Sequence, residues 1–295
     1  MKDSKSATFG LFLTFLGVLA FSLTLPMTRL AITALDPSQV AIWRAIIAAL
    51  LAGSILLVLK PPRPQGKQWA FVAACAAGTV FGFPLFTTLG MQSVTASHGA
   101  VVIGLLPLAT AVCGVIIAGE RPSALFWLSA VTGTGLTVMF VLRQADGGRI
   151  EIGHAWLFLA VVAAAVGYAY GGLASRTLKG WSVACWALVI SLPILALLGY
   201  LFTPPSVQTP PAALAAFLYL AVFSQLIGFF AFYKGLALAG IARASQVQLL
   251  QLFMTIGFAA TLFGEVWDGE TVLFGFLVVT AVAIGTRARI TLVAK

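Results

Sequence analysis

Apolar residues occur along this chain in long blocks that short polar connectors separate. Each block is about 20 residues long, the length that a helix needs to cross roughly 30 Å of hydrocarbon. Membrane strands would instead alternate with a period of two over blocks of about ten residues. The pattern therefore predicts membrane-spanning helices.

The blocks predict ten spans. Their expected bounds are residues 9–32, 38–59, 68–89, 96–118, 123–142, 154–174, 181–202, 212–234, 242–263 and 270–290. Helix-breaking residues lie between them, such as Asp36-Pro37 and the proline-rich segment 203–211. The first block is longer than the 7–15 apolar residues of a signal peptide, so we expect it to remain as the first span. No connector is long enough for a soluble catalytic domain.

An internal repeat organises these spans. Sliding the sequence by 145 positions brings together Gly90 with Gly235, Gly119 with Gly264, and Glu120 with Glu265. Residues 1–146 and 147–295 then form two domains of five spans each, and an odd number of spans places them in opposite orientations. We expect an all-α membrane protein, with ten transmembrane helices as two inverted five-helix repeats around a central cavity. Secondary transporters often have this architecture, with the substrate between the halves near the bilayer midplane.

Charge supports the count of ten spans. Charged residues make up 8% of the chain, against roughly 25% in a soluble domain. With the N-terminus in the cytoplasm, thirteen basic residues fall on the inner side and three on the outer side. This positive-inside bias predicts a multi-pass protein of a bacterial-type cytoplasmic membrane, with both termini in the cytoplasm. It explains the net charge of +9 without nucleic acid. The expected partners are the bilayer and a small-molecule substrate, and we expect a functional monomer.

Two repeated segments and part of the second span resemble a known family. Residues 90–120 and 235–265 each hold a small-residue loop, an apolar helix and a closing Gly-Glu, and Pro37 precedes Trp43-Arg44 in the second span. These features resemble the EamA-type ten-helix exporters of the drug/metabolite transporter superfamily. The resemblance implies export of amino acids, aromatic ones among them, or of related metabolites, without an ATP-hydrolysing subunit. One position departs from it, because the family's proline is present as Pro107 in the first copy and replaced by Leu252 in the second.

Arg44 is the sharpest candidate for a substrate contact. It lies about six residues into the second expected span, roughly 9 Å deep. An arginine at that depth is costly unless it faces water or a partner. One interpretation is a fixed cation that binds a substrate carboxylate with two hydrogen bonds. The other is a side chain that reaches the lipid headgroups. Trp43 is open in the same way, as a cavity wall or as part of an aromatic belt.

Polar residues recur on single faces of apolar spans. Gln248, Gln251 and Thr255 share one face of the ninth span by their spacing, and Gln225 and Phe229 share one on the eighth. Hydrocarbon penalises unpaired amides, so we expect these faces to point at each other or into a wet cavity. The alternative is hydrogen bonding between helices that serves packing alone.

Further candidates are Ser22 on a polar face of the first span and Tyr168 in the sixth. Tyr168 lies beside glycines that would let a ligand or another helix approach. We expect purely structural roles for the Gly78-x-x-x-Gly82 motif, as a close helix contact, and for Glu120 and its repeat partner Glu265. The two glutamates should pair with an arginine or cap a neighbouring helix. The three cysteines lie in apolar blocks and are expected to serve packing.

The acidic residues of the chain lie at or near span ends, so no carboxylate is expected near the middle of the membrane. Proton-driven carriers usually carry one there, so we expect transport with weak proton coupling or none. No motif for ATP hydrolysis, zinc proteolysis or nucleophile-elbow chemistry occurs. We therefore expect no enzyme activity, no cofactor and no metal. The alternatives that remain are a multidrug or other metabolite exporter of the same fold, and a non-transporting receptor or assembly protein.

Overall fold

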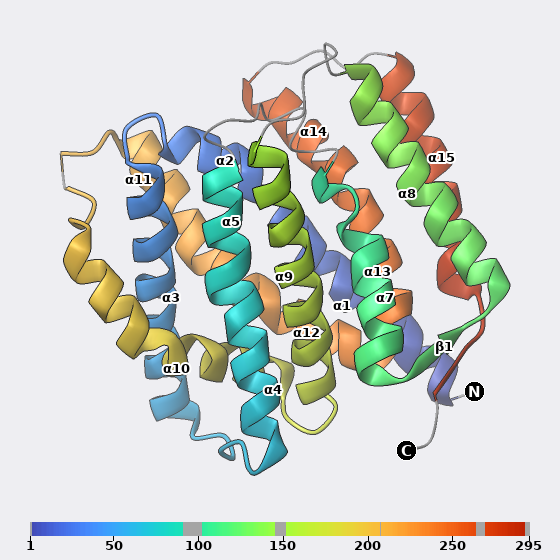
Figure 1. Ribbon diagram of the computed structural model, residues 1–295, viewed down its shortest axis with the longest axis horizontal. Helices are drawn as coiled ribbons and strands as arrows, with labels where there is room; N and C mark the ends of the chain where they lie inside the picture. Colours follow the sequence, from blue (N-terminus) through green and yellow to red (C-terminus); the bar gives the residue numbers. More distant parts are fainter. Residues whose placement is uncertain (1, 91–101, 145–151, 207, 264–268, 293–295) are drawn as a thin grey trace.

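The computed structural model describes residues 2–90, 102–144, 152–206, 208–263 and 269–292 (Figure 1). Helices run up and down in alternation, and the two ends of the chain lie at the same end of the bundle, here called the terminal end (Figure 1). The other end is called the far end.

Helices account for nearly all of the first half. Its elements are α1 (Lys2–Ser22), α2 (Thr24–Ala31), α3 (Pro37–Leu59), α4 (Lys67–Ala76), the π-helical η1 (Ala77–Gly82), α5 (Phe83–Gly90), α7 (Leu106–Ala118), the short strand β1 (Glu120–Pro122) and α8 (Ala124–Gln144). The breaker Asp36-Pro37 begins α3 as the sequence suggests. The Asp36 carboxylate accepts a hydrogen bond from the backbone nitrogen of Ser38 at 2.8 Å, and Pro37 occupies the first turn, where no amide hydrogen is needed.

The second half repeats this order. Its elements are α9 (Ile152–Ala174), α10 (Gly180–Leu201), α11 (Pro211–Tyr219), the π-helical η2 (Leu220–Ile227), α12 (Gly228–Ala239), α13 (Ile241–Ser245), the 3-10 segment η3 (Gln246–Leu249), α14 (Leu250–Phe263), α15 (Gly269–Arg287) and the strand β2 (Ile290–Leu292). Each of the ten expected spans thus corresponds to one helix or to a run of consecutive helical segments.

Among the residues that the structure describes, six helical units are long and apolar enough to cross a membrane. They are Lys5–Ala31, Pro37–Leu59, Lys67–Thr87, Ile152–Ala174, Gly180–Leu201 and Pro211–Ala239. Leu106–Ala118, Ala124–Phe140 and Val272–Arg287 are shorter apolar helices. Five helical units in each half, with the chain reversing direction at each step, give the halves opposite orientations (Figure 1).

Packing between helices follows the repeat. α3 packs against α10, and α8 packs against α15, so that the second and fifth spans contact their counterparts in the other half. α1 packs against α12, and the repeat-equivalent helices α9 and α4–α5 pack in the same way. The α3–α10 pair and the α8–α15 pair lie at opposite edges of the bundle (Figure 1). The largest buried cluster, which includes Phe21, Tyr168 and Phe232, lies among helices of both halves.

Several spans that the sequence suggested as single helices are interrupted. The π-helical segments η1 and η2 end at Gly82 and Ile227, positions that the 145-residue offset relates, and they interrupt the third and eighth spans. The ninth span is interrupted by η3, even though it has Leu252 in place of the family's proline, the residue type that usually interrupts a helix. In the fourth span a turn at Gly104–Leu105 precedes α7. The π segments shift the backbone hydrogen-bond pattern, which is common at functional sites.

Close approach of α4–η1–α5 to α9 confirms the expected role of Gly78 and Gly82. A Cβ added to Gly78 would clash with the carbonyl oxygen of Ala163 and lie 2.7 Å from the Cα of Gly167. One added to Gly82 would lie 2.7 Å from the Cβ of Ala163. The glycines therefore permit contact between the two backbones.

Candidate substrate site

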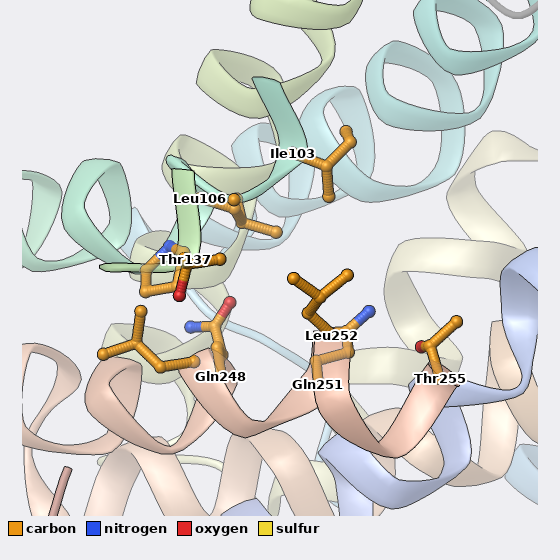
Figure 2. Close-up of a pocket in the computed structure, with 10 residues that line it drawn as sticks. Ile103, Leu106, Thr137, Gln248, Gln251, Leu252 and Thr255 are labelled. Atoms are coloured by element: carbon orange, nitrogen blue, oxygen red, sulfur yellow. The ribbon is translucent and has the colours of Figure 1, made fainter. Parts of the chain in front are cut away.

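A crevice opens between α7, α8 and the ninth span, and it is called here the axial crevice. The residues that line it are Ile103, Gly104, Leu106, Pro107, Thr137, Gln248, Leu249, Gln251, Leu252 and Thr255. Its volume is about 40 Å³, which is room for a few water molecules and not for a metabolite, so a substrate requires the walls to separate. Figure 2 shows Gln248 of η3 and Gln251 and Thr255 of α14 facing Ile103 and Leu106 across the crevice, with Thr137 beside Gln248.

Gln248 reaches this crevice without a hydrogen-bond partner. Its side chain is 5% exposed, and neither the nitrogen nor the oxygen of its amide has a partner among the residues that the structure describes. An unmade hydrogen bond on a buried amide costs about 1–3 kcal/mol. Gln248, Gln251 and Thr255, which the sequence predicts on one face, all line this crevice, and Gln248 has bonding capacity that a ligand or water can use.

A second group of polar side chains joins the third and eighth spans, and it is called here the lateral cluster. It comprises Cys75, Thr79, Gln225 and Tyr233, all buried. The Gln225 Nε2 donates to the carbonyl oxygen of Thr79 over a long 3.4 Å. The Tyr233 hydroxyl lies 3.0 Å from the Cys75 sulfur and donates to the Thr79 hydroxyl at 3.4 Å. Thr79 lies in η1 and Gln225 lies in η2. The polar contact between the two halves is therefore made at the two irregular segments of the backbone.

Phe229 and Tyr168 form the apolar border of the lateral cluster. Phe229 lines a small void of about 10 Å³ together with Gln225 and Tyr233, so Gln225 and Phe229 lie on the same side of the eighth span, as their spacing predicts. The ring of Tyr168 lies 6.0 Å from that of Phe229 and 4.9 Å from that of Phe232, and Phe21 lies 4.8 Å from Phe229. The sixth, eighth and first spans therefore meet in one aromatic group.

Arg44 is buried inside the bundle, next to this aromatic group. Only 7% of the residue is exposed, and its electrostatic neighbour is the Tyr168 hydroxyl. Within the described ranges the Nε atom has no hydrogen-bond partner, and the ion pairs found there, Arg143–Glu270 and Arg176–Glu120, do not include Arg44. A buried cation without a carboxylate is unfavourable, so Arg44 offers a position for an anionic group.

Trp43 and Ser22 already have partners inside the protein. The Trp43 indole nitrogen donates to the carbonyl oxygen of Phe202 at 2.9 Å, which ties α3 to the end of α10. The Ser22 hydroxyl donates to the carbonyl oxygens of Val18 and Leu19, and its own carbonyl accepts from Thr255 at 2.7 Å. Ser22 thus connects the first span to the crevice wall, while its side chain does not line the crevice.

Glu120 confirms the structural role expected from the sequence. Its carboxylate is buried and accepts from Arg176 at 2.9 Å and from the backbone nitrogens of Ile241 and Ala242 at 2.8 and 2.7 Å. It therefore pairs with an arginine and caps a neighbouring helix at once. Glu120 also begins β1, which pairs antiparallel with β2 and so joins the segment after α7 to the C-terminal segment. Its repeat partner Glu265 lies outside the described residues.

Sequence reasoning missed three polar residues of this region. Thr79 accepts from both Gln225 and Tyr233, and Thr137 lines the axial crevice from α8. Gln246 is fully buried, and neither end of its amide has a partner in the described part of the chain. Its position in a Gln-x-Gln pair with Gln248 was a visible signal, but a regular helix would place the two on different faces.

Comparisons with known proteins agree with this architecture. The model of the EamA-like transporter family matches twice, over residues 8–142 and 151–286. An uncharacterized transporter of Bacillus subtilis, YdeK, is 42% identical over 276 residues, covering 92% of this chain and 95% of that protein. A second, YcbK, is 28% identical over 253 residues, covering 78% and 77%.

A solved crystal structure shares the fold, with a TM-score of 0.76 at 19% identity over 94% of this chain and 98% of the other. A sequence identity of 19% shows a shared fold alone, whereas the two matches to the family model and the relative at 42% identity show the family. Together with the paired five-helix halves and the polar crevice between them, they show that this chain is a membrane protein that belongs to the EamA-like transporter family.

Proposed function

We propose that this transporter exports amino acids across a bacterial-type cytoplasmic membrane, as a secondary carrier that works by alternating access. The observation that carries the choice of substrate is the buried guanidinium of Arg44, which has no carboxylate partner within the described ranges. A guanidinium binds a carboxylate through two parallel hydrogen bonds. A substrate carboxylate would supply the negative charge that none of the described ion pairs supplies to Arg44.

The other polar groups fit a small zwitterion. Among the described residues, Gln225 makes one long hydrogen bond of 3.4 Å and Gln248 makes none, so both can bind the polar groups of a substrate. Gln251 lines the same crevice as Gln248. Tyr168 interacts electrostatically with Arg44, and its ring lies 6.0 Å from that of Phe229, so both rings are candidates to contact the substrate. These residues come from spans of both halves, as a site between inverted repeats requires.

Contacts between the halves suggest how the site opens. Across the lateral cluster the third and eighth spans are joined by two hydrogen bonds of 3.4 Å and by the 3.0 Å contact between the Tyr233 hydroxyl and the Cys75 sulfur, and none of these involves a charged group. The terminal end is held more firmly, because Glu120 receives three short bonds from the second half. We therefore propose that the halves rock against each other, and that the bonds of the lateral cluster break first. The expected cytoplasmic location of both termini would make the terminal end the inner end.

We further propose that proton coupling is weak or absent. The chain has eight acidic residues, and the sequence places them at or near span ends. Glu120 begins the strand β1 at the terminal end, and Glu270 lies in the first turn of α15, where it pairs with Arg143. Net export would then follow the gradient of the substrate itself, with no ATP-hydrolysing subunit.

Counterflow in proteoliposomes tests this function. Purified protein is placed in vesicles loaded with one unlabelled amino acid, and uptake of the labelled form is followed across a panel, with and without a pH gradient. We expect accumulation of at least one amino acid and little response to the gradient. Absence of counterflow across the whole panel, from a protein that remains folded, would exclude amino acids as substrates.

The role of Arg44 is tested in the same assay. Arg44→Ala is expected to reduce counterflow at least tenfold, since one hydrogen-bonded ion pair contributes about 1.5–3 kcal/mol. Arg143→Ala is the matched control, because it removes an exposed arginine from a surface pair. Transport by Arg44→Ala at the level of the control would end the assignment of this residue to the carboxylate.

A further inference from the structure

The axial crevice is built from repeat-equivalent residues. The 145-residue offset that relates the halves pairs four lining positions of the fourth span with four of the ninth: Ile103 with Gln248, Gly104 with Leu249, Leu106 with Gln251, and Pro107 with Leu252. A site that meets both copies at equivalent positions lies on the pseudo-twofold axis between them. The crevice is therefore central to the fold by its construction.

The two walls have different chemistry despite this pseudo-symmetry. On the wall from the fourth span, Ile103, Leu106 and Pro107 offer aliphatic surface (Figure 2). On the wall from the ninth span, Gln248 and Gln251 offer amides, and Gln248 has no other partner among the described residues. None of the lining residues is charged.

From this asymmetry we infer that the crevice selects the substrate by its side chain, which is uncharged and has one hydrogen-bonding and one apolar face. The pairs Ile103/Gln248 and Leu106/Gln251 are the specificity-determining positions. A charged side chain would enter a buried site without a counter-charge, which is strongly unfavourable. A purely apolar side chain would leave the Gln248 amide unpaired. The inference rests on the proposed transport of amino acids and narrows it to those with uncharged, amphipathic side chains.

Two isosteric substrate pairs separate these effects. Threonine and valine have nearly the same shape and differ in one hydroxyl, and glutamine and glutamate differ in charge at nearly equal size. We expect threonine to compete for counterflow better than valine, and glutamine better than glutamate. One neutral hydrogen bond corresponds to a preference of roughly three- to tenfold.

Exchange of the two walls is the sharpest test. Gln248→Ile makes the first pair of positions alike and is expected to reduce the preference for threonine over valine while valine is still transported. The double variant Ile103→Gln/Gln248→Ile restores one amide on the other side of the axis and should recover part of the preference. Gln208→Ile, in an exposed connector, is the control that leaves the preference intact. Gln251→Leu, matched to Leu106, repeats the test at the second pair if Gln248→Ile does not fold.

The results distinguish this inference from the function on which it rests. If the unmodified protein transports no amino acid, the proposed function fails. If it transports amino acids but prefers glutamate, or if Gln248→Ile and Gln251→Leu keep the unmodified ratio of threonine to valine, the crevice does not select the side chain and the inference is overturned.

Discussion

Glu120 and Arg44 are both buried charged residues, and the structure treats them in opposite ways. Glu120 is held at the terminal end by Arg176 and by two backbone nitrogens that begin α13. Arg44 is a buried residue of α3 that interacts electrostatically with Tyr168, and its Nε has no partner in the described part of the chain. Both residues are almost completely inaccessible to solvent, so burial alone does not separate them.

The difference shows how structural and functional charges can be told apart in a membrane bundle. A buried charge whose bonding capacity is filled from within the protein holds helices in place, and its loss exposes every group that it satisfied. A buried charge without hydrogen-bond or ion-pair partners in the protein lowers the stability of the fold, and a bound ligand can supply the missing partner. Gly78 and Gln248 differ in a similar way. The contact at Gly78 is complete within the protein, whereas the amide of Gln248 has no partner among the described residues. Three stability measurements sharpen it.

Removal of the filled charge should have the largest effect on stability. Glu120→Ala leaves Arg176 and the first turn of α13 without their acceptor, and we expect the free energy of unfolding to fall by about 3–5 kcal/mol. Thermal unfolding in detergent measures the effect. Glu270→Gln is the control, since its pair with Arg143 is partly exposed, at 62% for Arg143 and 34% for Glu270, and should contribute about 0–1 kcal/mol. Equal melting temperatures for the two variants would contradict a structural role for Glu120.

A methyl group at the close helix contact should have an intermediate effect. Gly78→Ala places a Cβ against the carbonyl oxygen of Ala163, and we expect a loss of about 1–3 kcal/mol from the strain of overpacking. Gly53→Ala is the matched control, because its added Cβ would meet nothing nearer than Val189 Cγ2 at 3.8 Å. The same unfolding assay compares them. A Gly78→Ala protein as stable as Gly53→Ala would show that α4–α5 and α9 can separate without cost.

Replacement of the unfilled charge should affect stability least. Arg44→Met fills a similar volume without a charge, and such replacements of buried ions are often neutral or stabilising. We expect a melting temperature in the absence of substrate that equals or exceeds that of the unmodified protein, together with loss of the stabilisation that substrate provides. A large drop in the substrate-free melting temperature would place Arg44 with Glu120 among the structural charges.

The amino-acid sequence by itself determined the ten spans, their alternation and the relation between the halves. Hydrophobic blocks must match the thickness of the bilayer, and this constraint acts on each helix separately, so it is visible in local sequence. The role of Glu120 was also accessible, because a carboxylate at a span end has few alternatives to capping a helix or pairing with an arginine. The helix faces of Gln248 and Gln251, and of Gln225 and Phe229, followed from spacing alone.

Only the tertiary structure decided which polar groups remain without a partner. Trp43 bonds to Phe202 and Ser22 to its own helix, whereas Gln248 and Arg44 keep polar atoms without a partner among the described residues. The spacing of polar residues along the sequence does not distinguish these four side chains. The π segments and the 3-10 segment also escaped the sequence, since they shift faces by a fraction of a turn and leave hydropathy unchanged. Hydrogen-bond satisfaction depends on contacts between residues far apart in the chain, so it is fixed when the two halves pack together.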